Sequence, residues 1–395
     1  MSTRKGSKEE RDYRAFLSAL GAIVKRDPFP TSAPRKVDYW ADNKRVLSEL
    51  IKAEAEALIF PSSRIHVFFG PLGGGKSFAV SYLADANTRK VLTKHVAAGG
   101  KNDFLALSVP ASYPVKAGML TGSVYLGIFK KLLHEILSDP SLFASWRTTF
   151  RQDRSGGLGV VDQALRNMVD KASGTLNGRI SIPTLEKTEG YKLLTMQRSR
   201  IGSLKTQDDY VSAIGAVTGP LLTKYQRIMI AIDELEGLRS VTGSERLFFN
   251  DFVRRLVQEI EVGLIVILIF TRQTFEEVES VLQPAVLSRI SERIHFDFLR
   301  AKQDIIDYVQ ECLQKGAGVN PSDVIEPVAL EAFAADLIKY RREVTFRDIN
   351  KHLISIFAML YAQKKKPLKI TKEAYEEITK RISVEDVIRE LGAET

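Results

Sequence analysis

Cysteine is nearly absent from this chain, which contains only one, Cys312, among 395 residues. A single cysteine cannot form an internal disulfide, and it cannot build a cysteine-rich zinc site. The five histidines are scattered along the sequence without the spacing of a metal site. Because the polar N-terminus also shows no secretory segment, these absences predict a cytoplasmic protein.

Long hydrophobic runs are missing as well. The longest, Leu264 to Phe270, is far shorter than the roughly 20 residues that a helix needs to cross a bilayer, so no membrane partner is expected. The charges do not balance, because 57 lysines and arginines face 48 aspartates and glutamates and give a formal net charge of +9. This excess permits a DNA partner, although a basic surface without that role explains it as well.

The remaining composition is that of a globular protein, with 44% hydrophobic and 27% charged residues. Continuously apolar runs alternate with helical patterns, which is typical of a parallel sheet covered by helices on both faces. We therefore predict an α/β fold of the P-loop type followed by an all-helical C-terminal domain. The predicted strands are 64–69, 104–108, 228–232, 264–270 and 293–298, and the predicted helices are 11–24, 37–58, 78–84, 124–137, 247–260, 275–282, 285–290, 301–315, 323–338, 345–363 and 371–381.

Three parts are expected along the chain. They are an N-terminal tail with a short helix (1–26), an α/β nucleotide-binding core (27–298) and a helical lid domain (299–395). Within the core, scattered glycines weaken the pattern at about 138–225, which predicts an insertion of short helices and loops. Part of this insertion, Arg179 to Lys205, is mildly basic, and we weigh a solvated face against a nucleic-acid contact.

The segment Gly70-Pro71-Leu72-Gly73-Gly74-Gly75-Lys76-Ser77 fits the pattern G-x-x-x-x-G-K-[ST] of a phosphate-binding P-loop, or Walker A motif. A strand pattern precedes it and a helix pattern beginning at Phe78 follows it, which makes the match specific. Glycines let backbone N–H groups converge on a phosphate, and the helix N-terminus adds partial positive charge. Residues 70–78 would bind the nucleotide, with Lys76 on the β- and γ-phosphates and Ser77 on Mg²⁺. The alternative is a glycine turn that happens to precede Lys-Ser.

The strand pattern at 228–232 ends in Asp233-Glu234, as a Walker B motif does. Asp233 is the candidate ligand of Mg²⁺, often through water, and Glu234 could orient and polarise an attacking water. Kinases of small molecules need no such glutamate, because the substrate hydroxyl is their nucleophile. The pair therefore indicates hydrolysis.

These motifs resemble the AAA+ ATPases, in particular the branch of replication-initiator, origin-recognition and helicase-loader ATPases. The resemblance covers about 27–381 without the insertion, and it includes Pro28-Phe29 ahead of a long helix. The loop departs from the family's Gly-x-x-Gly-x-Gly-Lys-Thr by an extra glycine and a serine, both chemically permitted. The resemblance implies ATP as the nucleotide, Mg²⁺, hydrolysis to ADP and phosphate, and a homo-oligomer under ATP.

The resemblance also implies roles for three further residues. Thr271 falls at the position of sensor 1, with Arg272 as the alternative. Arg289 ends a leucine-serine-arginine segment whose arginine reaches a neighbouring subunit's γ-phosphate as a finger. Arg293 is the alternative finger. Arg289 could instead be a helix-end arginine that interacts favourably with the C-terminal dipole of its helix. Arg347 falls at the position of sensor 2, which contacts the γ-phosphate from the lid.

The expected function is that of an oligomeric ATP-dependent switch or loader, acting on DNA or on a DNA-bound protein partner. A mobile-element, transposition or antiviral-defence context fits it. The alternatives are a nucleotide-gated scaffold and a STAND-like signalling ATPase that acts on protein partners alone. The intact Glu234 argues against the scaffold, and no sensor repeat supports the signalling ATPase.

Overall fold

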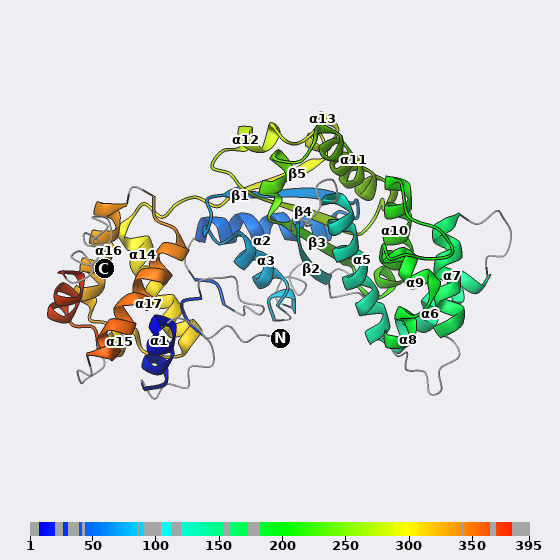
Figure 1. Cartoon of the computed structure of the whole chain (residues 1–395). Helices are drawn as coiled ribbons and strands as arrows, with labels where there is room; N and C mark the ends of the chain where they lie inside the picture. Colours follow the sequence, from blue (N-terminus) through cyan, green and yellow to red (C-terminus); the bar gives the residue numbers. More distant parts are fainter. Residues whose placement is uncertain are drawn as a thin grey trace, which may run out of the picture. The chain divides into compact units, whose positions relative to one another are not determined.

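A computed structural model gives the fold of most of the chain, and its contacts divide it into two compact units (Figure 1). The sheet unit comprises 48–70 and 79–295, and the helical unit comprises 1–47, 71–78 and 296–395. The predicted domain boundaries at 26 and 298 stay predictions. The described residues are 8–19, 27–30, 39–41, 44–85, 87–90, 104–111, 120–152, 159–172, 182–341, 343–363 and 369–380.

The sheet unit is built on five parallel strands in the order β2-β3-β4-β1-β5. This arrangement confirms the predicted α/β fold class, and the four most apolar strands lie within two residues of their predicted bounds. β5 begins and ends three residues earlier than predicted, and its exposed Ser291 hides the start of the strand pattern. The strands are β1 (Arg64–Gly70), β2 (Phe104–Pro110), β3 (Arg227–Asp233), β4 (Leu264–Thr271) and β5 (Ile290–His295).

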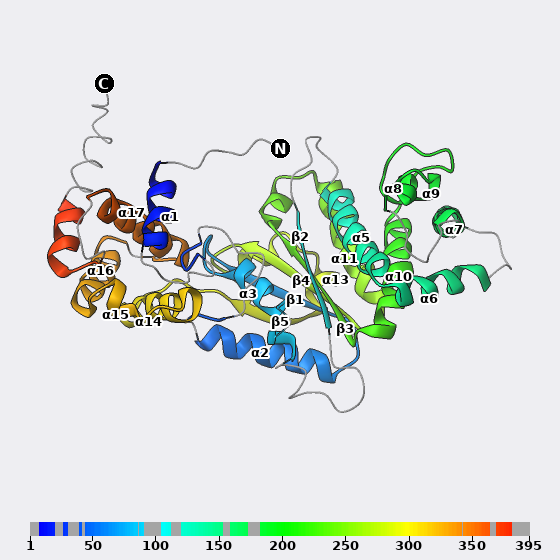
Figure 2. The same cartoon turned by 90° about the horizontal axis from the view of Figure 1, so that it is seen from below.

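Helices cover both faces of the sheet (Figure 2). Side chains alternate along a strand, so that Val67 joins the core beneath α5, α10 and α11 while Phe68, equally buried, points to the opposite face. On that opposite face the Nε–H of Arg227 in β3 donates to Ala57 O of α2. The sheet unit contains α2 (Lys44–Ile59, from residue 48), α3 (Lys76–Leu83, from residue 79), α5 (Leu120–Ser138), η1 (Leu235–Arg239), α11 (Gly243–Glu259), α12 (Phe275–Glu279) and α13 (Pro284–Leu287).

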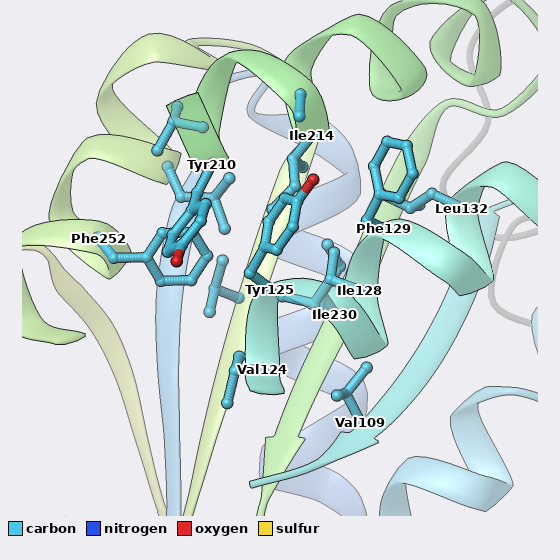
Figure 3. Packing of buried hydrophobic residues seen from close by; sticks show 14 of the residues in the cluster. Val109, Val124, Tyr125, Ile128, Phe129, Leu132, Tyr210, Ile214, Ile230 and Phe252 are labelled. Carbon is cyan, nitrogen blue, oxygen red and sulfur yellow. The ribbon is translucent and has the colours of Figure 1, made fainter. Parts of the chain in front are cut away.

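The predicted insertion is largely helical in its described residues. Its last helix, α10, runs for 18 residues and packs on α5, where the rings of Tyr125 and Tyr210 stack at 4.5 Å (Figure 3). The indole N–H of Trp146 donates to Ala216 O of α10. α10 is therefore part of the main core of the sheet unit. The helices of this region are α6 (Pro140–Gln152), α7 (Val160–Ala172), α8 (Ile182–Glu186), α9 (Glu189–Leu194) and α10 (Gln207–Lys224).

The helical unit gathers elements from both ends of the chain. α1 packs on α17, and the rings of Phe16 and Phe357 stack at 4.6 Å. The buried Asn350 of α17 donates to Pro30 O and accepts from the hydroxyl of Tyr308. The described elements are α1 (Lys8–Ala19), α14 (Lys302–Glu311), η2 (Cys312–Ala317), α15 (Pro321–Val324), α16 (Pro327–Tyr340), α17 (Phe346–Ala362) and the helical residues 372–380.

Several helix predictions were wrong at their ends. α5 and α11 each begin four residues before their predicted starts at 124 and 247, and α12 ends three residues before 282. The predicted helix 323–338 is divided into α15 and α16. α2 begins at Lys44, and residues 39–41 are not helical, because the rings of Tyr39 and Trp40 turn edge-on against Phe78 instead. The predicted helix 285–290 ends at Leu287. The predicted helix at 11–24 appears as α1, and its residues 20–24 lie outside the described part. Within the described residues, no helix has the length and apolar character to cross a membrane.

Candidate functional site

The predicted P-loop has the backbone conformation of a tight glycine loop. β1 ends at Gly70 and α3 begins at Lys76, so the strand, loop and helix follow one another as the sequence predicts. Gly73 and Gly75 have φ angles of 83° and 97°, which lie in the left-handed region that favours glycine. The N–H of Gly74 donates to Pro71 O and closes a turn inside the loop. Glycine is therefore required at positions 73 and 75 by the positive φ angles of the loop.

Lys76 is buried against the loop that precedes it. Its side chain is 6% exposed, and its ammonium group donates to Pro71 O at 2.7 Å. Burial of a lysine requires hydrogen-bond acceptors, and a P-loop supplies them from its own carbonyl groups and from phosphate oxygens. Ser77 follows in the first turn of α3, next to Phe78. The two residue types that a triphosphate and its Mg²⁺ require are thus adjacent at a helix N-terminus.

The N-terminus of α17 lies against this loop within the helical unit. A Cβ added to Gly73 would lie 2.6 Å from Arg347 Cβ and 3.0 Å from Thr345 Oγ1. Thr345 caps α17, because its Oγ1 accepts the N–H of Asp348 while the Asp348 carboxylate accepts the N–H of Thr345. The predicted sensor 2 residue, Arg347, therefore contacts the P-loop from the first turn of a capped helix.

Asp233 and Glu234 end β3 in an unusual backbone conformation. Glu234 has φ 63° and ψ 38°, a left-handed conformation that costs a non-glycine residue about 1–2 kcal/mol. Its N–H donates to Asp233 Oδ1 at 2.8 Å, and the 3₁₀ helix η1 begins directly after it. Partial burial and the negative charges of Asp233 and Glu236 raise the pKa of Glu234. Strain of this kind gathers at functional sites.

Thr271 lies at the same edge of the sheet. Parallel strands end at one edge, and β4 lies between β1 and β3. Thr271 is the last residue of β4 and is paired in register with Gly70 of β1. β3, which ends in Asp233, lies on the other side of β4. The N–H of Thr271 donates to Glu236 Oε1 at 2.9 Å. Arg272, the alternative for sensor 1, donates from Nη1 to Thr271 O.

The two candidate finger arginines are both exposed on the sheet unit. Arg289 donates from Nη1 to Ala285 O at 2.7 Å, one turn back in α13, which is the contact of a helix-end arginine. The guanidinium of Arg293 lies 3.9 Å from the centre of the Phe275 ring. Both arginines are thus held by neighbours in their own unit, and the choice between them as a finger stays a prediction.

Sequence reasoning missed two features beside these residues. Tyr39 and Trp40 place their rings edge-on against Phe78, at 6.2 and 5.9 Å between ring centres, so aromatic surface follows the P-loop directly. Their stretch was predicted as helix, which obscured the contact. Glu236 was also missed, because no local pattern links it to Thr271.

No protein-family model and no curated protein matches the chain. Solved structures do. The Aeropyrum pernix ORC1 protein in complex with DNA matches at TM-score 0.48 and 13% identity, over 88% of this chain and 66% of that one. The A. pernix ORC2 protein in its ADPNP-ADP complexes matches at 0.49 and 10%, over 87% and 70%. Drosophila ORC bound to DNA matches at 0.47 and 11%, over 96% and 68%.

This chain is similar in fold to origin-recognition proteins. The chain spans 66% of the length of the ORC1 protein, just under two thirds. With identities of 10 to 13% and TM-scores below 0.5, the likeness carries nothing about activity, ligands or partners.

Proposed function

We propose that the chain is a Mg²⁺-dependent ATPase of the AAA+ type. The observation that carries the proposal is the P-loop, which leaves β1 at the sheet edge where β3 also ends in Asp233-Glu234. The loop N–H groups and Lys76 would bind the phosphates. Ser77 and Asp233 would hold Mg²⁺, which neutralises charge on the β- and γ-phosphate oxygens.

The remaining roles are those that the motif and the family resemblance imply. Glu234, beside the metal ligand Asp233, would orient the attacking water. Thr271 would contact the nucleotide or water as sensor 1, and Arg347 would reach the γ-phosphate from the first turn of α17. Arg289 would complete the site of a neighbouring copy, so that hydrolysis depends on assembly into an oligomer. The products would be ADP and phosphate.

We further propose that hydrolysis drives an oligomeric switch or loader that acts on DNA or on a DNA-bound protein. The net charge of +9 supports DNA, and a mobile-element, transposition or antiviral-defence setting fits such a switch. The competing proposal is a nucleotide-gated scaffold or STAND-like signalling ATPase with protein partners alone. Both forms of this proposal predict ATP binding that does not require DNA. The scaffold also predicts that bound ATP is not hydrolysed.

Glu234→Gln tests the hydrolytic role. The variant should bind ATP with unchanged affinity and hydrolyse it about 100-fold more slowly, because the amide cannot accept a proton from water. It should accumulate as an ATP-bound assembly, visible by light scattering. Calorimetry and phosphate release measure the two quantities. Glu261→Gln is the matched control, since Glu261 is exposed before β4, at the opposite edge of the sheet.

Each contrary result has a distinct meaning. Full turnover in Glu234→Gln would assign the water to another residue. ATP binding without turnover in the wild type would favour the scaffold.

The proposed DNA partner is tested by measuring how the affinity for DNA depends on salt concentration. If the basic stretch up to Lys205 binds duplex DNA, the logarithm of the affinity should fall linearly with the logarithm of salt concentration, by about 0.9 per phosphate neutralised. Reversing the exposed Arg198 and Arg200 to glutamate should weaken binding and flatten that slope. The second candidate, Lys364-Lys365-Lys366, lies outside the described residues. Fluorescence anisotropy that shows no binding at low salt, with and without ATP, would leave only protein partners.

A further inference from the structure

Glu236 links two parts of the sheet edge that the strands themselves do not join. The described ladder between β3 and β4 ends at the pair Ile232 and Leu268. Beyond it, the Glu236 side chain crosses from η1 and accepts the N–H of Thr271, at 2.9 Å from Oε1. The end of β4 is therefore held to the segment that follows Asp233-Glu234 by one carboxylate.

The segment that carries Glu236 is itself firmly anchored. Leu235 and Leu238, which flank Glu236 in η1, are 1% and 0% exposed within the core of the sheet unit. Glu236 is half-buried and three residues from Asp233. Movement of η1 would therefore be transmitted through this hydrogen bond to the backbone of Thr271. The contact fixes a backbone position, because the carboxylate accepts a main-chain N–H rather than pairing with a charged side chain at the surface.

We propose that Glu236 is a positioning residue for hydrolysis, whose carboxylate fixes the backbone of Thr271 relative to Asp233-Glu234. This role rests on the proposed ATPase function. Glu236 is not itself a ligand of nucleotide, metal or water in this role. It acts by keeping Thr271 in place, and small displacements of positioned groups cost catalysis more than binding.

Two substitutions separate the hydrogen bond from the side chain's negative charge. Glu236→Ala removes the acceptor and should lower kcat about 10- to 100-fold, with the dissociation constant of ATP unchanged. Glu236→Gln keeps a carbonyl oxygen at the same reach and should restore most of kcat. In a double-mutant cycle, Glu236→Ala should lower kcat much less in the Thr271→Ala background than it does in the wild type.

Glu277→Ala is the matched control. Its carboxylate also accepts backbone N–H groups just after β4, from Gln273 and Thr274, at 3.0 and 3.4 Å. That contact does not involve the residues after β3. The control should therefore keep its kcat, and thermal melting shows whether each variant remains folded.

The outcomes separate this role from the ATPase itself. No turnover in the wild type would overturn both proposals. If the wild type hydrolyses ATP and Glu236→Ala has the same kcat as the wild type, only the positioning role is overturned. Equal losses in the alanine and glutamine variants, or additive losses in the cycle, would also overturn it. Loss of kcat in Glu236→Ala with recovery in Glu236→Gln, and no loss in Glu277→Ala, would establish it.

Discussion

Arg289→Ala is expected to keep its affinity for ATP and to lose turnover by about 10³-fold or more, the scale of arginine fingers in GTPases. The reason is electrostatic. In the transition state charge is spread over the phosphate oxygens, and in the proposed oligomer the neighbour's guanidinium would stabilise that charge from the far side of the pocket. Phosphate release at saturating ATP, together with calorimetric titration of ATP, measures both quantities.

Mixing two inactive variants tests whether the finger acts between copies. Arg289→Ala keeps an intact nucleotide pocket, and Lys76→Ala keeps an intact arginine. A mixed oligomer therefore contains interfaces with both, and the mixture should recover part of the wild-type activity. No recovery would mean that Arg289 acts within its own copy.

Arg293→Ala is the control for this prediction, because Arg293 is also exposed and lies on the next strand. Its cation–π contact with Phe275 is worth about 0.5–1 kcal/mol at an exposed site, so its loss should not unfold the unit. If Arg293→Ala loses turnover while Arg289→Ala does not, the finger is Arg293. Activity per molecule that does not change with protein concentration would refute the shared site for both arginines.

Lys76→Ala is expected to abolish detectable ATP binding. The variant removes the one ammonium that the P-loop buries, and with it the charge-assisted hydrogen bonds to the phosphates. Pro71 O loses its lysine donor at the same time, so melting temperature is measured as well. Lys130→Ala, at an exposed position of α5, is the control. Unchanged ATP affinity in folded Lys76→Ala protein, measured by calorimetry, would contradict the P-loop assignment.

The sequence predicts the elements whose signal is local. β4 is apolar over its whole length because it is buried on both faces, and the P-loop glycines meet φ requirements that few other residues satisfy. The capping pair Thr345 and Asp348 lies within one turn at the start of α17. In each case the residues that carry the signal are close in sequence to the structure they specify.

Tertiary contacts account for what the sequence did not predict. α10 contains Gly215, Gly219 and Pro220, which read as helix breakers, yet packing on α5 and on the sheet holds the helix. Glu236 and Thr271 are 35 residues apart, so no window of sequence connects them. The start of α2 shifted because Trp40 packs on Phe78. Propensity is a weak prior against such packing.

The contact between Gly73 and Arg347 also bears on how the chain can change over evolutionary time. The conflict that a Cβ at position 73 would meet is with the Cβ of Arg347, an atom that no change of rotamer moves. A relative with a side chain at position 73 must therefore carry glycine at position 347 or hold its helix in another place. The two positions are therefore expected to change together rather than independently. An alanine at position 73 in a relative would indicate that the helix lies elsewhere or that position 347 has lost its side chain.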